Sequence, residues 1–343
     1  MATFMDNSAA QAFVAADAQQ YFVSPLFLGN DVLAKFDVMT DIKGNTYLDH
    51  FSAASKLTVA DNGAAFSATN DASAYTNPQI SPKRVEAEIA MNGQNFFNKV
   101  KGQILRSGTS KDNVDGTLLK KIGSEILMQG IMADFNRQVW FGDTNALVTG
   151  TGSGNYNVYD GGFASMLSKL ADAQIVAATY SGATEGDAIA ALKSCYDAAT
   201  AELKELPKTF YVSGKIADDY VRDLTAKGVA PAYVDLQNGI SGLSYLGIPI
   251  VVRRDWDTVL ANDYALVRQI AQEESGGTPA IGGTALGARI ALIADNALVV
   301  GTDMSSASVE SWYNKDQKEF RFRFGYLCGS VLLDAKLAVL YGN

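Results

Sequence analysis

Apolar and charged residues alternate along two segments of the chain. Between positions 85 and 91, Val, Ala, Ile and Met occupy every second position with Glu or Ala between them, and between 320 and 324 Phe alternates with Arg. A period of two residues predicts strands with one buried face. We expect the Phe side chains to pack inward, and Arg321 and Arg323 to face solvent or acidic groups of a neighbouring chain. The apolar runs 331–333 and 338–340 predict a buried closing strand whose partners come from distant sequence.

The strongest helical pattern covers residues 115–141. Apolar residues recur there mostly at every fourth position, as in Leu118, Ile122, Ile126, Ile131, Phe135 and Val139. Such a stripe is typical of a helix with one buried face. Asp115 or Thr117 is suited to cap the start of the helix, and Gly142 is suited to end it. At about 1.5 Å per residue, the helix would be roughly 38 Å long.

Helical and strand patterns alternate through the second half of the chain, after a short helical piece near 163–170. The order helix, strand, helix, strand, strand indicates a mixed α/β domain. The expected helices cover 185–206 and 216–227, and the expected strands cover 209–212, 248–252, 288–294 and 298–300.

Two N-terminal segments have little core of their own. Residues 1–35 show no clear period and are typical of an arm that lies on another surface. Residues 36–95 predict long β-hairpins, with a first turn at Lys43-Gly44-Asn45 between strands at 36–39 and 46–48, and a second at Asp61-Asn62-Gly63. Because the region has few large aliphatic residues, such hairpins would be marginal in isolation.

Composition narrows the class of protein. The chain has 343 residues, of which 48% are hydrophobic and 19% are charged. This length and composition favour one large or two joined ordered domains. The net charge is -9. No strongly basic cluster supports a sequence-specific nucleic-acid reader. We expect no signal peptide and no membrane helix, a cytoplasmic site of synthesis, and buried free thiols at Cys195 and Cys328.

Candidate catalytic and metal-binding motifs are weak. His50 is the only histidine, so histidine-dependent nucleophilic catalysis would have to run through it. Gly150–Gly154 lacks the spacing of a phosphate loop, and Asp112–Gly116 fails the calcium-loop pattern at Val114. The acid pairs Asp218-Asp219 and Glu273-Glu274 lie in charged stretches that are expected to face water. The sequence therefore predicts no catalytic residue, no cofactor site and no metal site.

Several segments, taken in order, resemble the major capsid protein of tailed bacteriophages, whose fold is shared with encapsulins. The similarity extends along nearly the whole chain, and it depends on the order and spacing of the segments rather than on any single motif. The segments are LLKKIGSEILMQGIMADFNRQVWFG (118–142), LPKTFYVSGKIADDYVRDLTAKG (206–228), LSYLGIPIVVRRDWD (243–257), ARIALIADNALVVGT (288–302) and FRFRFGYLCGSVLLDAKLAVL (320–340).

The resemblance implies an α+β capsid fold. The implied parts are an N-terminal arm (1–35), an extended β-hairpin loop (36–95), a peripheral domain (96–184 and 306–343) with a spine helix at 115–141, and an axial α/β domain (185–305). No long acidic helical extension precedes these parts as a built-in scaffold.

The implied function is structural. Copies of the chain would form hexamers and pentamers of an icosahedral shell in a virion. The shell would be assembled in the host cytoplasm with a separate scaffolding protein and a portal, and would enclose double-stranded DNA without sequence-specific binding. The extended loop would reach over a neighbour, with contacts between subunits at Lys43, Lys56, Arg321 and Arg323. The main alternative is an encapsulin-type nanocompartment shell; a tail-tube or decoration protein and an enzyme with an unrecognised site are weaker alternatives.

Overall fold

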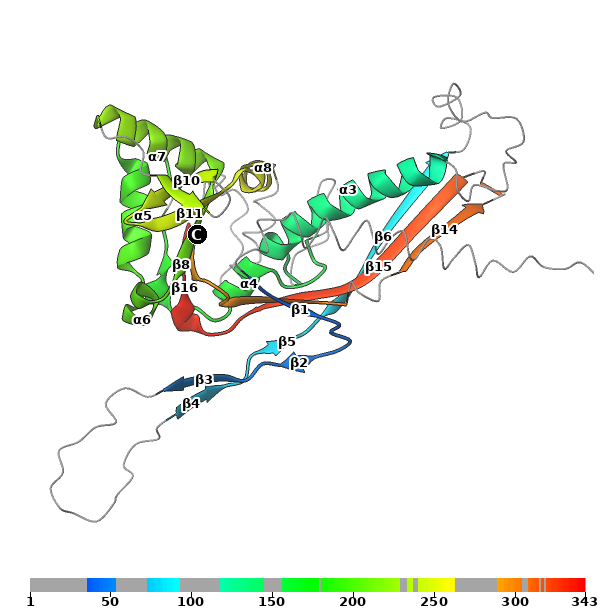
Figure 1. The fold of residues 1–343 in the computed structure, drawn as a ribbon, viewed down its shortest axis with the longest axis horizontal. Coiled ribbons are helices and arrows are strands. Elements are labelled where there is room, and N and C mark those ends of the chain that lie inside the picture. Colours follow the sequence, from blue (N-terminus) through cyan, green and yellow to red (C-terminus); the bar gives the residue numbers. More distant parts are fainter. Residues whose placement is uncertain are drawn as a thin grey trace, which may run out of the picture.

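A computed structural model describes residues 36–53, 73–92, 118–144, 156–178, 180–228, 233–236, 240–262, 289–303, 308–314, 316–317 and 319–342. These residues form two lobes, each built on a β-sheet, and a thin ribbon of paired strands that extends away from both (Figure 1). The mixed α+β architecture agrees with the expected fold class.

One lobe contains a sheet of seven of the described strands, and we call it the seven-stranded lobe. Strand β8 pairs in parallel with β11 and antiparallel with β12, so the sheet is mixed. Every residue of β12 and β16 is buried. Helices α5 and α7 pack together beside the sheet (Figure 1). The strand order is β7 (Ile175–Val176), β16 (Ala338–Tyr341), β12 (Ile290–Ala294), β8 (Lys208–Ser213), β11 (Ile248–Arg253), β10 (Ile240–Tyr245) and β9 (Tyr233–Leu236); the helices are α5 (Asp187–Asp197), α6 (Ala201–Glu205), α7 (Gly214–Ala226) and α8 (Arg254–Asn262).

The other lobe, the five-stranded lobe, contains the long helix α3 (Leu118–Phe141) and the short helix α4 (Gly162–Leu167). Helix α3 runs alongside the long strand β15, and its buried residues Leu127, Ile131, Phe135 and Val139 recur at every fourth position (Figure 1). The predicted spine helix is thereby confirmed over its described length. Its expected caps, Asp115 and Thr117, lie outside the described residues. The strands are β1 (Asp37–Thr40), β13 (Leu298–Thr302), β15 (Glu319–Leu332), β14 (Ser308–Asn314) and β6 (Lys83–Asn92).

The ribbon consists of two short antiparallel pairs of strands. Strand β2 (Thr46–Tyr47) pairs with β5 (Gln79–Ile80), and β3 (His50–Ala53) pairs with β4 (Ser73–Thr76). The base of the ribbon has a small core: Ile42 and Ile80 are buried against Val299 and Val331 of the five-stranded lobe. Beyond that point the ribbon extends away from the body of the molecule (Figure 1).

A cluster of aromatic rings joins the two lobes. The Trp140 ring on α3 lies 4.8 Å from Trp256 of α8 and 4.9 Å from Tyr211 of β8, measured between ring centroids. Phe163 of α4 lies 4.9 Å from Trp256. Buried aromatic residues contribute large apolar area and prefer such tilted or edge-to-face contacts. The two lobes therefore share one continuous core.

The N-terminal hairpin predicted around Lys43-Gly44-Asn45 is wrong. Strand β1 pairs in parallel with β13, from Asp37↔Val299 to Thr40↔Thr302, and does not pair with β2. The reason is burial: β1 adds a strand to a sheet that already has a core, whereas β2 continues into the ribbon. Strand β6 pairs with β15 along ten residues and so belongs to the five-stranded sheet. The ribbon is for this reason shorter than the expected extended loop.

The single helix predicted over 185–206 is also wrong in part. The chain forms α5 and α6 with a break at 198–200, where the Thr200 side chain accepts a hydrogen bond from the Leu203 N–H and caps α6. Ile189 is only half-buried, and the buried face of α5 is formed by Ala188, Leu192 and Cys195.

Three strands, β7, β13 and β16, join sheets on the other side of the expected domain boundary. Strand β13 follows β12 after a tight turn with Asn296 at φ 64°, yet it pairs with β15 in the five-stranded lobe. Strand β16 closes the seven-stranded sheet beside β12. Each lobe thus contains a strand from the sequence range that was expected for the other, and the domain division itself stays a prediction.

Candidate functional site

The edge strand β6 and its partner β15, the central strand of the five-stranded sheet, present one apolar face and one charged face. Phe322 and Phe324 are buried, whereas Arg321 and Arg323 are half-buried, which confirms the predicted alternation. Val85, on the neighbouring β6, is buried on the side of α3. The apolar face is therefore used for the core under the long helix, and the charged face is available at the surface.

The two arginines find acidic partners within their own chain. Arg323 forms an ion pair with Glu86 and lies 3.6 Å from Glu88, both on β6. Arg321 lies 3.6 Å from Glu319 and donates a hydrogen bond to the Gln317 side chain. Exposed pairs of this kind contribute about 0–1 kcal/mol each. A contact of either arginine with a second subunit stays a prediction.

The two predicted lysines lie in or beside the ribbon segment of the sequence. Lys43 is exposed and its Nζ lies 3.5 Å from Asp41 Oδ1, in the connection that leads from β1 into β2. Lys56 lies outside the described residues. The structure therefore does not bring the four predicted contact residues together: Arg321 and Arg323 are on β15, and Lys43 is on the loop before the ribbon.

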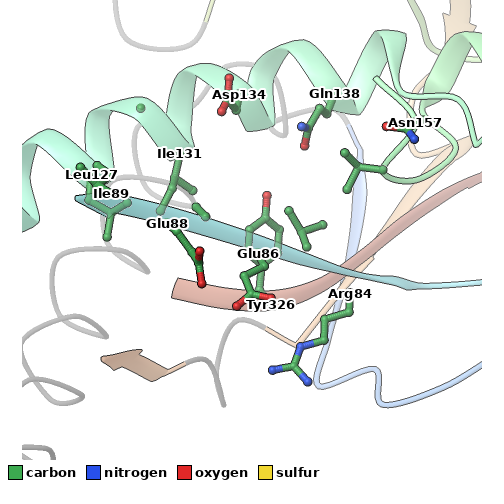
Figure 2. Close-up of a pocket in the computed structure, with 14 residues that line it drawn as sticks. Arg84, Glu86, Glu88, Ile89, Leu127, Ile131, Asp134, Gln138, Asn157 and Tyr326 are labelled. Carbon is green, nitrogen blue, oxygen red and sulfur yellow. The ribbon is translucent and has the colours of Figure 1, made fainter. Parts of the chain in front are cut away.

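A groove of about 400 Å³ lies between α3 and β6 (Figure 2). Its acidic groups are engaged: Glu86 and Glu88 with Arg323, and Asp134 with Arg137 at 2.9 Å. Burial, with a smaller contribution from Cys328, raises the pKa of the Tyr326 phenol well above its usual range, so this phenol stays neutral. Among the described residues that line the groove, none is a histidine, a cysteine or a lysine. Its chemistry is that of a packing surface, with no nucleophile beside a base.

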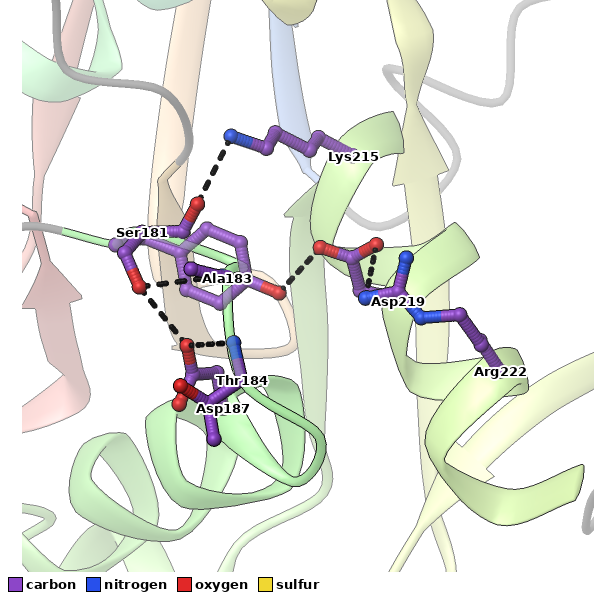
Figure 3. Close-up of polar contacts among 8 residues, drawn as sticks. Ser181, Ala183, Thr184, Asp187, Lys215, Asp219 and Arg222 are labelled. Atoms are coloured by element: carbon purple, nitrogen blue, oxygen red, sulfur yellow. Dashed lines mark hydrogen bonds and ion pairs between the residues drawn. The ribbon is translucent and has the colours of Figure 1, made fainter. Parts of the chain in front are cut away.

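A polar network fixes the loop before α5 to helix α7 (Figure 3). The Tyr180 hydroxyl donates to Asp219 Oδ2 at 2.7 Å, and Arg222 pairs with Asp219 at 3.0 Å. Burial and the hydrogen bond to Asp219 raise the Tyr180 pKa. Asp219 is only 8% exposed, which corrects the expectation that the Asp218-Asp219 pair faces water; Asp218 is exposed and accepts two hydrogen bonds from Arg254.

The same loop is held at the start of α5. Asp187 accepts hydrogen bonds from the Ser181 hydroxyl at 2.9 Å and from the Thr184 N–H at 3.1 Å, and these bonds lower its pKa. Lys215 donates to the Ser181 carbonyl oxygen at 3.3 Å (Figure 3). The network ties a loop to two helices, which is a structural role. Sequence analysis did not find it, because the signal is a set of separate Ser, Tyr and Asp residues.

The remaining candidate motifs add no chemistry. Cys195 and Cys328 are buried free thiols, as expected. His50 is placed on β3, paired with Thr76. Gly150–Gly154, Asp112–Gly116 and Glu273-Glu274 lie outside the described residues. Within the described ranges, no group of three or more His, Cys, Asp or Glu side chains is arranged to hold a metal ion, and no helix is long and apolar enough to cross a membrane.

Comparison with known sequences gives no family: no protein-family model and no curated protein matches the chain. Comparison with solved structures gives extensive matches. A chain from the satellite phage P4 procapsid including size determination (Sid) protein matches with a TM-score of 0.55 at 10% identity, covering 94% of this chain and 98% of that one. A chain from the capsid structure of the cyanophage P-SCSP1u matches with a TM-score of 0.50 at 11% identity, covering 90% and 86%.

An encapsulin is also among the similar structures. A chain of the holo-SrpI encapsulin complex from Synechococcus elongatus PCC 7942 matches with a TM-score of 0.48 at 13% identity, covering 89% of this chain and 84% of that one. That score is too low to support an argument for the encapsulin alternative. The matches to phage structures extend over nearly the whole of both chains, and the protein therefore has the tailed-phage capsid fold.

Proposed function

We propose that this chain is the shell subunit of a tailed-phage capsid. Many copies assemble into an icosahedral shell that encloses the viral genome, and the subunit has no enzymatic role. The observation that carries the proposal is the combination of the fold with the ribbon. Two lobes share one continuous core, while a two-stranded ribbon extends away from both (Figure 1).

The energetics of the ribbon favour assembly. A two-stranded pair of strands is marginally stable at best in water and needs a covering surface. Strands β2 and β5 have two residues each, and the Tyr47 side chain is 61% exposed. A surface supplied by a second copy of the chain would complete the burial. In this proposal the ribbon covers a neighbouring subunit, and five or six copies form the rings of the shell.

The remaining parts of the proposal concern partners. A separate scaffolding protein and a portal direct assembly in the host cytoplasm, and the shell encloses double-stranded DNA. The net charge of -9 is compatible with a wall that encloses DNA without gripping it. Contacts at Lys43, Lys56, Arg321 and Arg323 belong to the proposal as rim contacts between subunits.

The direct test is particle formation. The chain is expressed alone and with candidate scaffolding proteins from the same genome, separated by size-exclusion chromatography, and imaged by negative-stain electron microscopy. Closed shells, or rings of five and six subunits, are expected. A monomer or dimer that persists with every scaffold would contradict the proposal. Shells that contain a protein cargo and no DNA when isolated from the natural source would support the encapsulin alternative instead.

A further inference from the structure

Two of the large hydrophobic side chains that are exposed among the described residues come together at one end of the seven-stranded sheet. Leu206 is 42% exposed and Leu246 is 68% exposed. Strands β8 and β11 run in parallel with Ile250 opposite Phe210. Leu246 lies four residues before Ile250, and Leu206 lies four residues before Phe210. The register therefore places two leucines, 40 positions apart in sequence, at the same end of adjacent strands.

The backbone at Leu246 is in an unfavourable conformation for its residue type. Leu246 and Gly247 form the two-residue connection between β10 and β11, with φ values of 51° and 77°. A turn with positive φ at both positions favours Asn-Gly or Asp-Gly. A leucine in this region costs roughly 1–2 kcal/mol relative to a right-handed conformation. Such a cost at an exposed turn points to a role outside the isolated subunit.

The apolar surface at this end is small and lies beside charged groups, the exposed Glu205 and the half-buried Lys208, whose Nζ donates to the Leu206 carbonyl oxygen at 3.0 Å. Besides the two leucines it includes Pro207 and Gly247, which are also exposed. A typical pairwise interface buries about 800 Å² per partner, far more than these residues offer, so the surface is not a separate docking site for an unrelated protein. It fits as one part of a larger contact.

The position of the surface indicates that larger contact. Leu206 directly follows α6, and α6 and the ribbon strands β3 and β4 all lie toward the left side of the molecule in Figure 1. A second copy of the chain that covers the ribbon on that side also faces the end of the lobe that contains α6. The two exposed leucines would then be buried by the same neighbour.

We propose that Leu206 and Leu246 form an apolar contact with a second copy of this chain, in the same interface as the ribbon. The inference rests on the proposed shell function and deepens it, because it assigns a specific contact on the seven-stranded lobe. The leucine at position 246 is retained for association, at the expense of the turn that Asn would stabilise.

The test separates the turn from the contact. Leu246→Asn places the residue that the turn favours, so the melting temperature of the unassembled subunit is expected to stay equal or rise. Shell or ring formation is expected to need at least about tenfold higher protein concentration, since a buried leucine contact is lost. Leu246→Met, which keeps a large apolar side chain in the same backbone conformation, is the matched control and is expected to assemble like the original chain.

A proximity measurement makes the result independent of yield. A benzophenone-maleimide probe is attached to Leu246→Cys; the two natural thiols are buried and do not compete. Irradiation is expected to give covalent dimers in assembled particles and none in dilute subunits. Normal assembly of Leu246→Asn, or particles without crosslinks, overturns the inference and leaves the shell function intact. Failure of the unaltered chain to assemble with any scaffold overturns both.

Discussion

The seven-stranded lobe and the ribbon are parts of one chain with opposite ways of burying apolar surface. In the lobe, every residue of β12 and β16 is buried within the chain. In the ribbon, strands of two to four residues extend beyond the base at which Ile42 and Ile80 are buried. The lobe is stabilised by its own sequence, whereas we infer that the outer part of the ribbon needs a surface outside the subunit. A shell subunit needs both parts, because it must fold alone and associate repeatedly.

The largest expected effect concerns the junction between the lobes. Trp140→Ala removes a fully buried ring that contacts Trp256, Tyr211 and Phe163. We expect the free energy of unfolding to fall by about 3–5 kcal/mol. Urea denaturation followed by far-UV circular dichroism measures the change.

The matched control for the junction is Trp312→Ala. Trp312 lies on β14 and is 41% exposed, so its loss is expected to cost less than about 1 kcal/mol. Equal costs for the two tryptophans would contradict the shared core and would mean that the lobes are stabilised separately.

The second expected effect tests whether the lobes unfold together. Cys195 is in the seven-stranded lobe and Cys328 is in the five-stranded lobe, and both are buried. Burial raises the pKa of Cys328 to about 12 and also raises that of Cys195, so both are protonated at pH 8. We expect a thiol reagent to label both only as the whole subunit unfolds, at the same urea concentration. Labelling of one thiol well before the other, read by mass spectrometry, would contradict a single cooperative unit.

A smaller effect on the subunit is expected from shortening the ribbon. His50 and Thr76 are paired, so residues 50–76 can be replaced by Gly-Gly with little disturbance at the base. We expect the free energy of unfolding to change by less than about 1 kcal/mol, because an isolated pair of strands is marginally stable at best and adds little to the fold of the subunit. Electron microscopy is expected to show no shells.

The control for the shortened ribbon replaces only residues 54–72 with Asn-Gly. This change keeps the β3–β4 pair, since Ala53 lies opposite Ser73. It separates the contribution of the paired strands from that of the segment between them. Normal shells from the 50–76 replacement would remove the ribbon from the assembly mechanism.

Sequence patterns predicted the elements that are stabilised by burial along a single segment. The stripe that includes Phe135 and Val139 predicted α3, and the Phe-Arg alternation predicted the two faces of β15. The buried closing strand was also predicted, because Ala338–Leu340 has no polar position to expose. In each case, the local pattern of side chains directly reflects the burial in the folded chain.

The pairing of distant strands was not predictable in the same way. Asp37–Thr40 reads as one arm of a hairpin with the following strand, yet it pairs with Leu298–Thr302. The competing partner is 262 residues away in sequence, and only the folded sheet brings it next to β1. The candidate contact at Leu206 and Leu246 was missed for the same reason: the parallel register of β8 and β11 brings these leucines to one end, and no local pattern records that register.

The smallest expected effect concerns Arg323. Its partners Glu86 and Glu88 belong to its own chain, so Arg323→Gln is expected to lower the free energy of unfolding by less than about 1 kcal/mol. The loss should shrink as salt is added, because salt screens exposed charges. If Arg323 serves only its own chain, the concentration needed for assembly will be unchanged, as for Lys43→Gln, whose ion pair with Asp41 is even more exposed. A loss of assembly larger than the loss in free energy of unfolding would instead support the predicted contact between subunits. The charged face of β6 and β15 would then belong, like the ribbon, to the surface between subunits.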